Sequence, residues 1–212
     1  DVRNSIEQAI DWKCDVIKNY AEVNRGVYAN IALGAKWVFE REEKAIFLED
    51  DNLPEVSFFQ FCREMLIRYE NDSRILWVCG TNYFGEYKPK SKASYMFTRH
   101  MLPCGWASWS GKFMSFYDFD LSLMDDPYVV KEMSQSYTDK RLYRQQVESI
   151  QREGRRLQKM GRFASWDHHM TLTLRANGLL GVVPAKNQIK NMGVDEYSIH
   201  GGTSMSNEMT RR

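Results

Sequence analysis

Three adjacent carboxylates, Glu49, Asp50 and Asp51, are the side chains of this sequence best suited to chemistry, and we call them the acidic triplet. They follow Ala45–Leu48, an apolar run that is too short for a helix and has no polar face, so a buried strand is predicted there. Like charges at the end of a buried strand repel one another unless a cation compensates them, and Mg2+ and Mn2+ prefer carboxylate oxygens. The triplet therefore predicts a metal site, although a turn rich in Asp and Asn before Pro54 explains the same residues without one.

Helix and strand patterns alternate on both sides of the triplet. Apolar residues at helical spacing predict helices over 28–39 and 58–69, and a buried run predicts a second strand over 75–79. Two successive helix–strand pairs indicate an α/β fold with a mostly parallel sheet, right-handed crossovers and flanking helices. Ligands of such sheets bind at the carboxyl ends of the strands, which is where the triplet is expected.

The second half of the chain is predicted to add short strands and charged helices. Strands are expected over 95–98 and 180–183. The charged stretch 127–160 favours one or two surface helices. The pair Asp125-Asp126 precedes Pro127 without a buried strand leading into it, so it is interpreted as a helix-capping turn.

A compact loop is predicted at Gly105–Gly111, where two tryptophans lie among small residues. Its glycines allow a ligand to approach the backbone, and the flat faces of Trp106 and Trp109 suit the C–H groups of a sugar. Packing in the hydrophobic core is the alternative for each indole.

Asp167 lies at the start of a predicted helix that ends at Asn177-Gly178. A helix cap or first-turn acid explains this carboxylate without any catalysis, so both interpretations stay open. The neighbouring His168 and His169 are adjacent in sequence, and one helix face cannot present both to a single metal ion. The spacing therefore argues against a zinc-protease type of site.

Length and composition describe one ordinary folded domain. The chain has 212 residues, of which 43% are hydrophobic and 27% are charged, so it can bury one sizeable core. A formal net charge of +1 gives no support for a large basic surface, and nucleic acid is not an expected partner. The four cysteines lack the spacing of zinc sites and are predicted to be reduced core thiols of a cytosolic protein. No apolar run approaches 18 residues, so no transmembrane segment is predicted.

Several short motifs occur together in one order along the chain. In combination they resemble bacterial GT-A-fold glycosyltransferases that use nucleotide-sugar donors, and the acidic motif is similar to that of the N-acetylglucosaminyltransferase I type. The resemblance spans nearly the whole chain, and the combined order is more specific than any single motif. The matching motifs are Asn24-Arg25-Gly26 with Asn30, the acidic triplet with Pro54, Ser57-Phe58-Phe59, Gly80-Thr81-Asn82, Gly105–Trp109, Trp166-Asp167, and Asn191-Met192-Gly193 through His200.

The resemblance implies a fold and a domain organisation. Residues 1–212 are expected to form a single GT-A-like domain with a mostly parallel sheet, in which 127–160 is a helical surface insertion. Members of this family carry a strand and a glycine-containing loop before the region where this chain begins. The domain is therefore expected to lack the first strand and to be incomplete at its amino terminus.

The resemblance also assigns roles to individual residues. The last acid of the triplet, Asp51, and a carboxyl-terminal histidine, His200, are expected to bind Mn2+ or Mg2+, which bridges the donor diphosphate. Asp167 matches the general base that removes the acceptor hydroxyl proton in inverting members. Residues expected to bind the nucleotide-sugar donor are Asn24, Gly26, Asn30, Glu49, Asp50, Gly105, Trp106 and Trp109.

The implied activity is inverting transfer of a sugar from a nucleotide-diphosphate donor to a hydroxyl of a carbohydrate or glycolipid acceptor. A metal suits this chemistry because it neutralises the departing diphosphate. The expected role is surface polysaccharide or glycoconjugate synthesis in the cytoplasm, at the inner face of the membrane. The main alternative is a non-catalytic GT-A-like domain that binds a sugar or a partner. A nucleotidyltransferase is less favoured because the chain lacks a glycine-rich, lysine-bearing signature.

Overall fold

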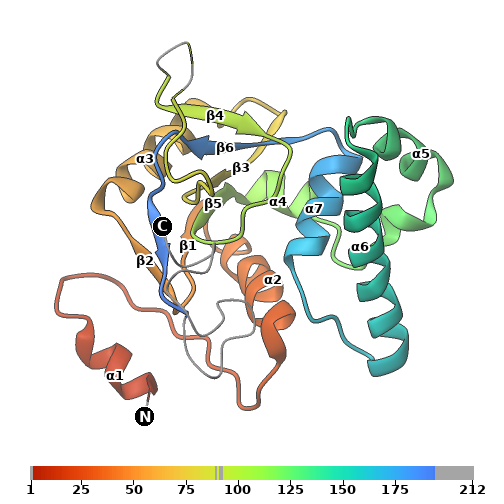
Figure 1. The fold of residues 1–212 in the computed structure, drawn as a ribbon. Coiled ribbons are helices and arrows are strands. Elements are labelled where there is room, and N and C mark those ends of the chain that lie inside the picture. The colour runs from red at the N-terminus through yellow and green to blue at the C-terminus, as the bar shows by residue number, and fades with distance from the viewer. Residues whose placement is uncertain (1, 89, 91–92, 194–212) are drawn as a thin grey trace.

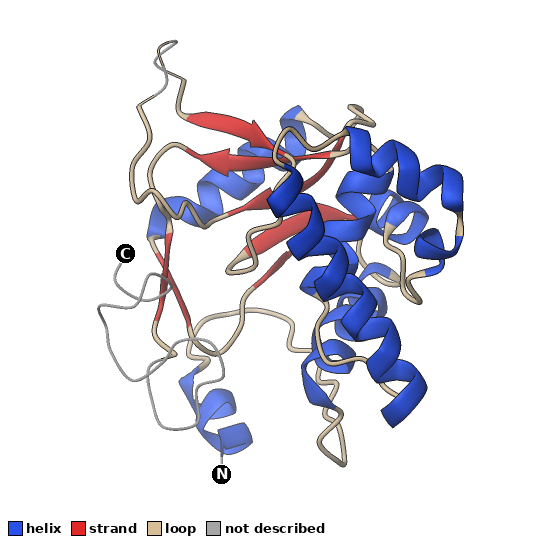
Figure 2. Ribbon diagram, turned by 45° about the vertical axis from the view of Figure 1, so that its right-hand side comes forward, coloured by secondary structure: helices blue, strands red, loops and turns tan. Residues whose placement is uncertain are grey.

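The alternating helix and strand patterns produce an α/β structure, seen in a computed structural model that describes residues 2–88, 90 and 93–193 (Figure 1). The described part contains a five-stranded sheet and a separate two-stranded ribbon. Helices lie on both sides of the larger sheet (Figure 2). In chain order the elements are α1 (Val2–Ala9), α2 (Gly26–Phe39), β1 (Lys44–Phe47), β2 (Asn52–Pro54), α3 (Val56–Arg68), β3 (Ile75–Cys79), β4 (Tyr95–Thr98), β5 (Trp106–Trp109), α4 (Ser110–Phe116), the 3-10 turn η1 (Ser122–Asp125), α5 (Pro127–Gln135), α6 (Lys140–Met160), α7 (Asp167–Ala176), β6 (Leu180–Pro184) and β7 (Ile189–Asn191).

The strands of the larger sheet are arranged in the order β1-β5-β3-β6-β4. Only β3 and β6 pair in parallel, whereas β5 pairs antiparallel with β1 and β3, and β4 pairs antiparallel with β6. The α/β class is therefore confirmed, but the predicted mostly parallel sheet is wrong. The reason is that β5, which was expected to be a loop, is a strand that runs between β1 and β3 in the opposite direction.

Three of the five strands do point in the same direction, as a parallel sheet would require. Since β1 and β3 are both antiparallel to β5, they point the same way, and β6 is parallel to β3. The carboxyl ends of β1, β3 and β6 consequently lie at one edge of the sheet, which we call the carboxyl edge. Helices α2 and α7 precede β1 and β6 in the chain, so each begins near this same edge.

Two hydrophobic layers cover the two faces of the sheet. On one face, Phe58, Cys62 and Leu66 of α3 pack against Val78 and its neighbours. On the other face, the apolar sides of α2, α4 and α7 pack together against the sheet. The amphipathic patterns of these helices thus predict their buried sides, because each buries one stripe against a strand layer.

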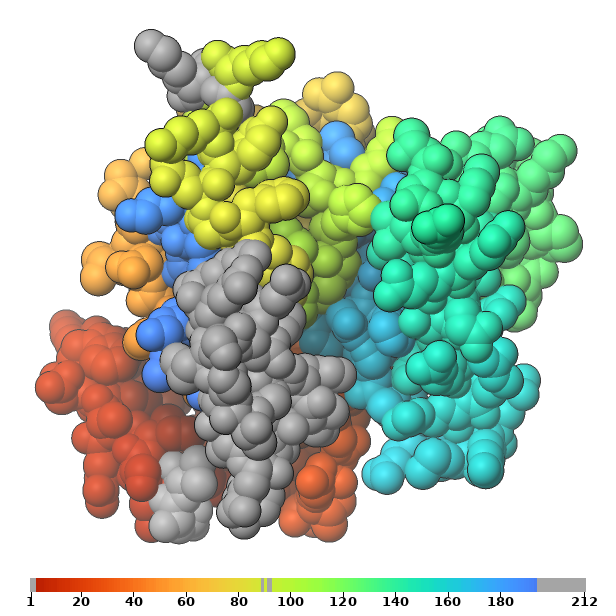
Figure 3. Space-filling view, in the orientation of Figure 1, coloured from red at the N-terminus to blue at the C-terminus, as the bar shows by residue number. Residues whose placement is uncertain are grey.

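The charged stretch 127–160 forms two helices, α5 and α6, as predicted. They pack against α7 through a third apolar cluster that includes Met133, Ile150 and Leu172. The side chain of Asp126 accepts hydrogen bonds from the first turn of α5, which confirms the predicted capping turn. In Figure 3 these helices, in green to teal, form one side of the molecule, and α1, in red, lies on the other side. None of the described helices is both long and apolar enough to cross a membrane.

The four cysteines are free thiols, but they do not share one environment. Cys62, Cys79 and Cys104 are buried, as predicted for core thiols. Cys14 is exposed, so the prediction is wrong for this residue. It lies in the irregular segment between α1 and α2, which is largely exposed to solvent and contributes no residue to the three apolar clusters.

Candidate active site at the carboxyl edge of the sheet

The acidic triplet lies directly beyond the carboxyl end of β1, in a turn that is held by Asn52. The backbone N–H of Asn52 donates to the Glu49 carbonyl at 3.0 Å. Its side-chain Oδ1 accepts from the N–H of Gly105 at 2.9 Å, and its Nδ2 donates to Asp51 Oδ1 at 2.6 Å. One amide side chain therefore ties the triplet to the start of β5 and supplies a donor to one of its acids.

The two-stranded ribbon holds Asp51 from the other side. Strands β2 and β7 pair antiparallel, with Asn52 opposite Asn191, and they lie side by side in Figure 1. Asn191 Nδ2 donates to Asp51 Oδ2 at 2.9 Å, and the N–H of Met192 donates to the Asp51 carbonyl at 2.7 Å. Both carboxylate oxygens of Asp51 thus accept a hydrogen bond, each from a different asparagine.

Two glycines allow the backbone to come this close. Gly193 has no room for a side chain, because a Cβ there would lie 2.7 Å from Asp51 Oδ2. Gly105 has a φ of +62° and would place a Cβ 2.5 Å from Cδ1 of Ile189. Gly105 was expected to contact the donor, and its observed contacts are with Asn52 through its N–H and with Gly80 through its carbonyl. Its position therefore serves the packing of the site.

Burial and the neighbouring negative charges both act on the Glu49 carboxyl. Burial, followed by the negative charges of Asp51, Asp50 and Asp167, raises the pKa of the Glu49 carboxyl to about 7. The start of α7, with Asp167 as its first residue, also lies near this edge because α7 precedes β6 and runs back to it, although 115 or more residues separate Asp167 from the triplet in the chain. The predicted acids are thus brought together at one edge.

Asp167 is the first residue of α7, and Trp166 is its N-cap residue. The side chain of Trp166 makes no capping hydrogen bond, and Asp167 lies in the first turn, so of the two structural alternatives the first-turn acid is the observed one. Its side chain is 37% exposed, and its Oδ2 lies 4.0 Å from His168 Nδ1. The carboxylate is therefore accessible from solvent.

The start of α2 supplies the residues predicted to shape the nucleotide pocket. Asn24 Oδ1 accepts from the N–H of Gly26 at 2.8 Å, and Gly26 has a φ of +78°. Asn30 is exposed one turn further along the helix. Because α2 is about 21 Å long and the four-residue strand β1 about 13 Å, the helix start extends beyond the strand end, toward the level of the triplet.

The tryptophans predicted to face a sugar lie in the core. Trp106 and Trp109 belong to β5 and are 1% and 4% exposed. They point to opposite faces of the sheet, since Trp106 stacks on Phe47 at 4.1 Å and Trp109 donates through Nε1 to the Leu66 carbonyl. The expected sugar-binding loop is therefore wrong, and the core-packing alternative is correct. Small residues on β5 gave the stretch a loop-like composition.

Asn52 is the site residue that the sequence prediction missed. It was grouped with the turn, and nothing in its residue type signals that it bonds to Gly105, 53 positions away. Asn82, which follows β3 at the same edge and belongs to the matching motif Gly80-Thr81-Asn82, is 2% exposed and donates to the carbonyls of Pro184 and Ala185. A polar amide within a few residues of a strand end is the signal that could have found Asn52 as well.

The predicted metal site can be compared with the side chains that are available as metal ligands. His200 lies outside the described residues. Within 2–88, 90 and 93–193, no three His, Cys, Asp or Glu side chains are grouped as ligands of one ion. Sites that share an ion with substrate phosphates need only one or two carboxylates. Asp51 has about four acceptor positions, of which two are used, so the residues present fit such a shared site.

Comparison of the chain with models of protein families and with curated proteins finds no match.

Proposed function

We propose that this chain is a metal-dependent, inverting glycosyltransferase with a GT-A-like fold. It would move a sugar from a nucleotide-diphosphate donor to a hydroxyl of a carbohydrate or glycolipid acceptor. The observation that carries the proposal is that the acidic triplet after β1 and Asp167 at the start of α7 lie at the same, carboxyl edge of the sheet. Two kinds of acid, one set at a strand end and one at a helix start, suit the two tasks of the reaction.

The first task is to hold the donor diphosphate. Asp51, assisted by Glu49, would hold Mn2+ or Mg2+, and such an ion supplies positive charge to the departing nucleoside diphosphate. Asn52 and Asn191 orient the Asp51 carboxylate from opposite sides. The start of α2, with Asn24 and Gly26, adds backbone N–H groups and the positive end of a helix dipole for an anionic ligand.

The second task is to deprotonate the acceptor. A sugar hydroxyl is a weak nucleophile, so a positioned carboxylate is needed as general base. Asp167 suits this task because it is partly exposed and α7 holds it at the edge where the triplet lies. Inversion, the identity of the acceptor, cytoplasmic location and a role in surface polysaccharide synthesis remain predictions from the resemblance.

One observation favours the non-catalytic alternative. Asn52 and Asn191 already supply hydrogen bonds to both oxygens of Asp51, so the turn is stabilised without a cation. A domain that only binds a sugar or a partner would need no metal ion at this turn. Calorimetry with nucleotide sugars, with and without Mn2+, tests whether donor binding needs the metal. A screen of nucleotide sugars for donor hydrolysis then separates the two functions, because the non-catalytic alternative predicts no turnover of any donor.

The decisive variant is Asp167→Asn, assayed for melting temperature, donor affinity and transfer rate. We expect nearly unchanged stability and donor affinity, and turnover slower by about 10^2 to 10^4. Asp125→Asn, which changes an exposed aspartate on η1, is the matched control and should transfer at the parental rate. Parental turnover by Asp167→Asn would eliminate the general-base role, and release of pyrophosphate from the donor would favour a nucleotidyltransferase.

A further inference from the structure

A pocket of about 310 Å3 lies away from the carboxyl edge, where β4 meets the helices. Because β4 is antiparallel to β6, its last residue lies at the opposite edge of the sheet from the triplet. Figure 1 shows this end of β4 directed toward α6 and α7. The pocket is lined by residues 97–100 after β4, by 136–139 between α5 and α6, by Leu142, and by Arg175 in the last turn of α7.

Arg175 is the unusual member of this lining. It is only 6% exposed, and its Nε has no hydrogen-bond partner. Its Nη2 lies 3.3 Å from Nδ1 of His100, and its guanidinium stacks 4.0 Å above the ring of Tyr137. Among the described residues it forms no ion pair. A buried cation without a counter-charge is costly, so an anion at this position would relieve a large penalty.

The other charges of the pocket leave an excess of positive charge. Arg99 also lines the pocket, and burial together with the charge of Arg99 lowers the pKa of Arg175. Burial and the charge of Arg175 lower the pKa of His100. The neutral ring therefore adds no charge to the pocket, and its Nδ1 accepts a hydrogen bond from Nη2 of Arg175. Asp139 is the one acid in the lining, and its Oδ1 is used by the N–H groups of Arg141 and Leu142 at the start of α6.

We propose that this pocket binds a small phosphomonoester. The guanidinium of Arg175, which lines the pocket, would donate to the phosphate oxygens, and Arg99 would balance the second negative charge. A phosphate group alone is too small for about 310 Å3, a volume at the lower end of small-molecule sites. The remaining space is bordered by Phe97 and Leu142, which suit a short organic part. This inference is independent of the glycosyltransferase proposal, since none of these residues belongs to that site.

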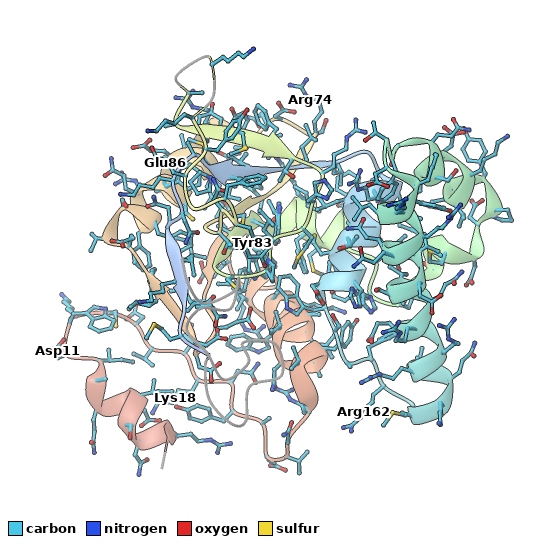
Figure 4. All side chains as sticks on the ribbon, viewed as in Figure 1. Asp11, Lys18, Arg74, Tyr83, Glu86 and Arg162 are labelled. Carbon is cyan, nitrogen blue, oxygen red and sulfur yellow. The ribbon has the colours of Figure 1, made fainter. Side chains whose placement is uncertain are left out.

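The test compares the parent protein with Arg175→Met and with a matched control. Arg162→Met removes an exposed arginine that follows the far end of α6, a helix about 30 Å long, and Figure 4 shows Arg162 there. Each protein is titrated with inorganic phosphate and with glycerol 3-phosphate at constant ionic strength. Binding is followed by the Nε–H signals of arginines in 1H–15N NMR spectra and by melting temperature.

We expect saturable binding by the parent and by Arg162→Met, with glycerol 3-phosphate tighter than inorganic phosphate. Arg175→Met should bind about 10- to 100-fold more weakly, because a charge-assisted hydrogen bond is lost. Without ligand its melting temperature should not fall, since an uncompensated buried charge is removed. If Arg175→Met does not fold, Arg99→Gln changes an exposed residue and should weaken binding several-fold.

Three results would overturn the proposal. The parent could show no saturable response to either phosphate probe. The parent and the pocket variants could respond equally, which would assign the response to general screening by salt. Acetate at the same ionic strength could bind more tightly than glycerol 3-phosphate, which would contradict the phosphate class.

Discussion

Replacing Asp51 by Asn tests both the hydrogen bonds and the charges of the acidic triplet. The aspartate accepts from Asn52 at 2.6 Å and from Asn191 at 2.9 Å, one bond at each carboxylate oxygen. An asparagine has one acceptor oxygen, so its NH2 group would face one of these two NH2 donors. The structure therefore predicts that Asp51→Asn lowers stability.

The size of the loss depends on the protonation of Glu49. A hydrogen bond to a charged acceptor contributes about 1.5 to 3 kcal/mol, so this is the expected cost when Glu49 is protonated and no repulsion is relieved. Glu49 has a pKa of about 7 in the folded state instead of 4.5, so the protein loses stability relative to the unfolded chain as pH rises from 4.5 to about 7. That gap corresponds to at most about 3.4 kcal/mol, before solvent screening reduces it.

Burial is the largest cause of the raised Glu49 pKa, so Asp51 accounts for less than half of it. Removing the charge of Asp51 should therefore return about 1 kcal/mol at pH 8 and nothing at pH 5.5. We expect Asp51→Asn to lower the free energy of unfolding by about 1.5 to 3 kcal/mol at pH 5.5, and by about 1 kcal/mol less at pH 8.

Urea unfolding with EDTA present, at both pH values, measures these differences. Asp50→Asn is the matched control, because Asp50 is exposed and its removal also takes one charge from the triplet. The control should be neutral at pH 5.5 and slightly stabilising at pH 8. In a second series, Mn2+ should raise the melting temperature of the parent and not that of Asp51→Asn. Parental or greater stability of Asp51→Asn at pH 5.5 would refute the reasoning.

Two further predictions concern the core beneath the site. Trp106→Ala should lower the free energy of unfolding by about 3 to 5 kcal/mol, because the indole is 1% exposed; a loss below about 1 kcal/mol in urea unfolding would contradict its core position. His169 is fully buried and its Nδ1 lies 2.8 Å from the Asp118 carbonyl; burial lowers its pKa from 6.5 to about 4. The fold therefore favours the neutral ring, and up to about 3.4 kcal/mol of stability should be lost as pH falls from 6.5 to 4. An NMR titration of the ring that gives a pKa near 6.5 would refute this.

The sequence predicts the elements of this fold better than their pairing. Strands β1, β3, β4 and β6 were expected within one or two residues of their observed bounds, because each is a short apolar run between turn signals. Strand β5 was missed because Gly105–Gly111 is rich in small residues, and its extended form depends on hydrogen bonds to β1 and β3 on either side. Strand direction has no local signal at all.

The acids of the candidate site were singled out from the sequence, whereas the contacts that hold them were not. Asp51 and Asp167 stand out because like charges gathered at a buried strand end need compensation and because Asp167 matches a family motif, although a turn and a helix start explain acids at both places. Asn52 and Asn191 form the frame around Asp51, yet their roles follow from contacts across 53 and 140 positions. The two tryptophans were misassigned for a related reason, since burial of an indole depends on the layers around it.

The position of β6 between β3 and β4 has a consequence for how the chain folds. Both neighbours are made much earlier, and Ile75 of β3 pairs with Leu180 of β6. Until residue 184 has been synthesised, β3 keeps one unpaired edge and β4 has no partner strand in this sheet, and such edges invite association with other chains. Closing so long a stretch of chain before the sheet is complete also slows folding relative to a sheet of sequential hairpins. Strand β6, made last of the five, is thus the one that joins β4 to the rest of the sheet.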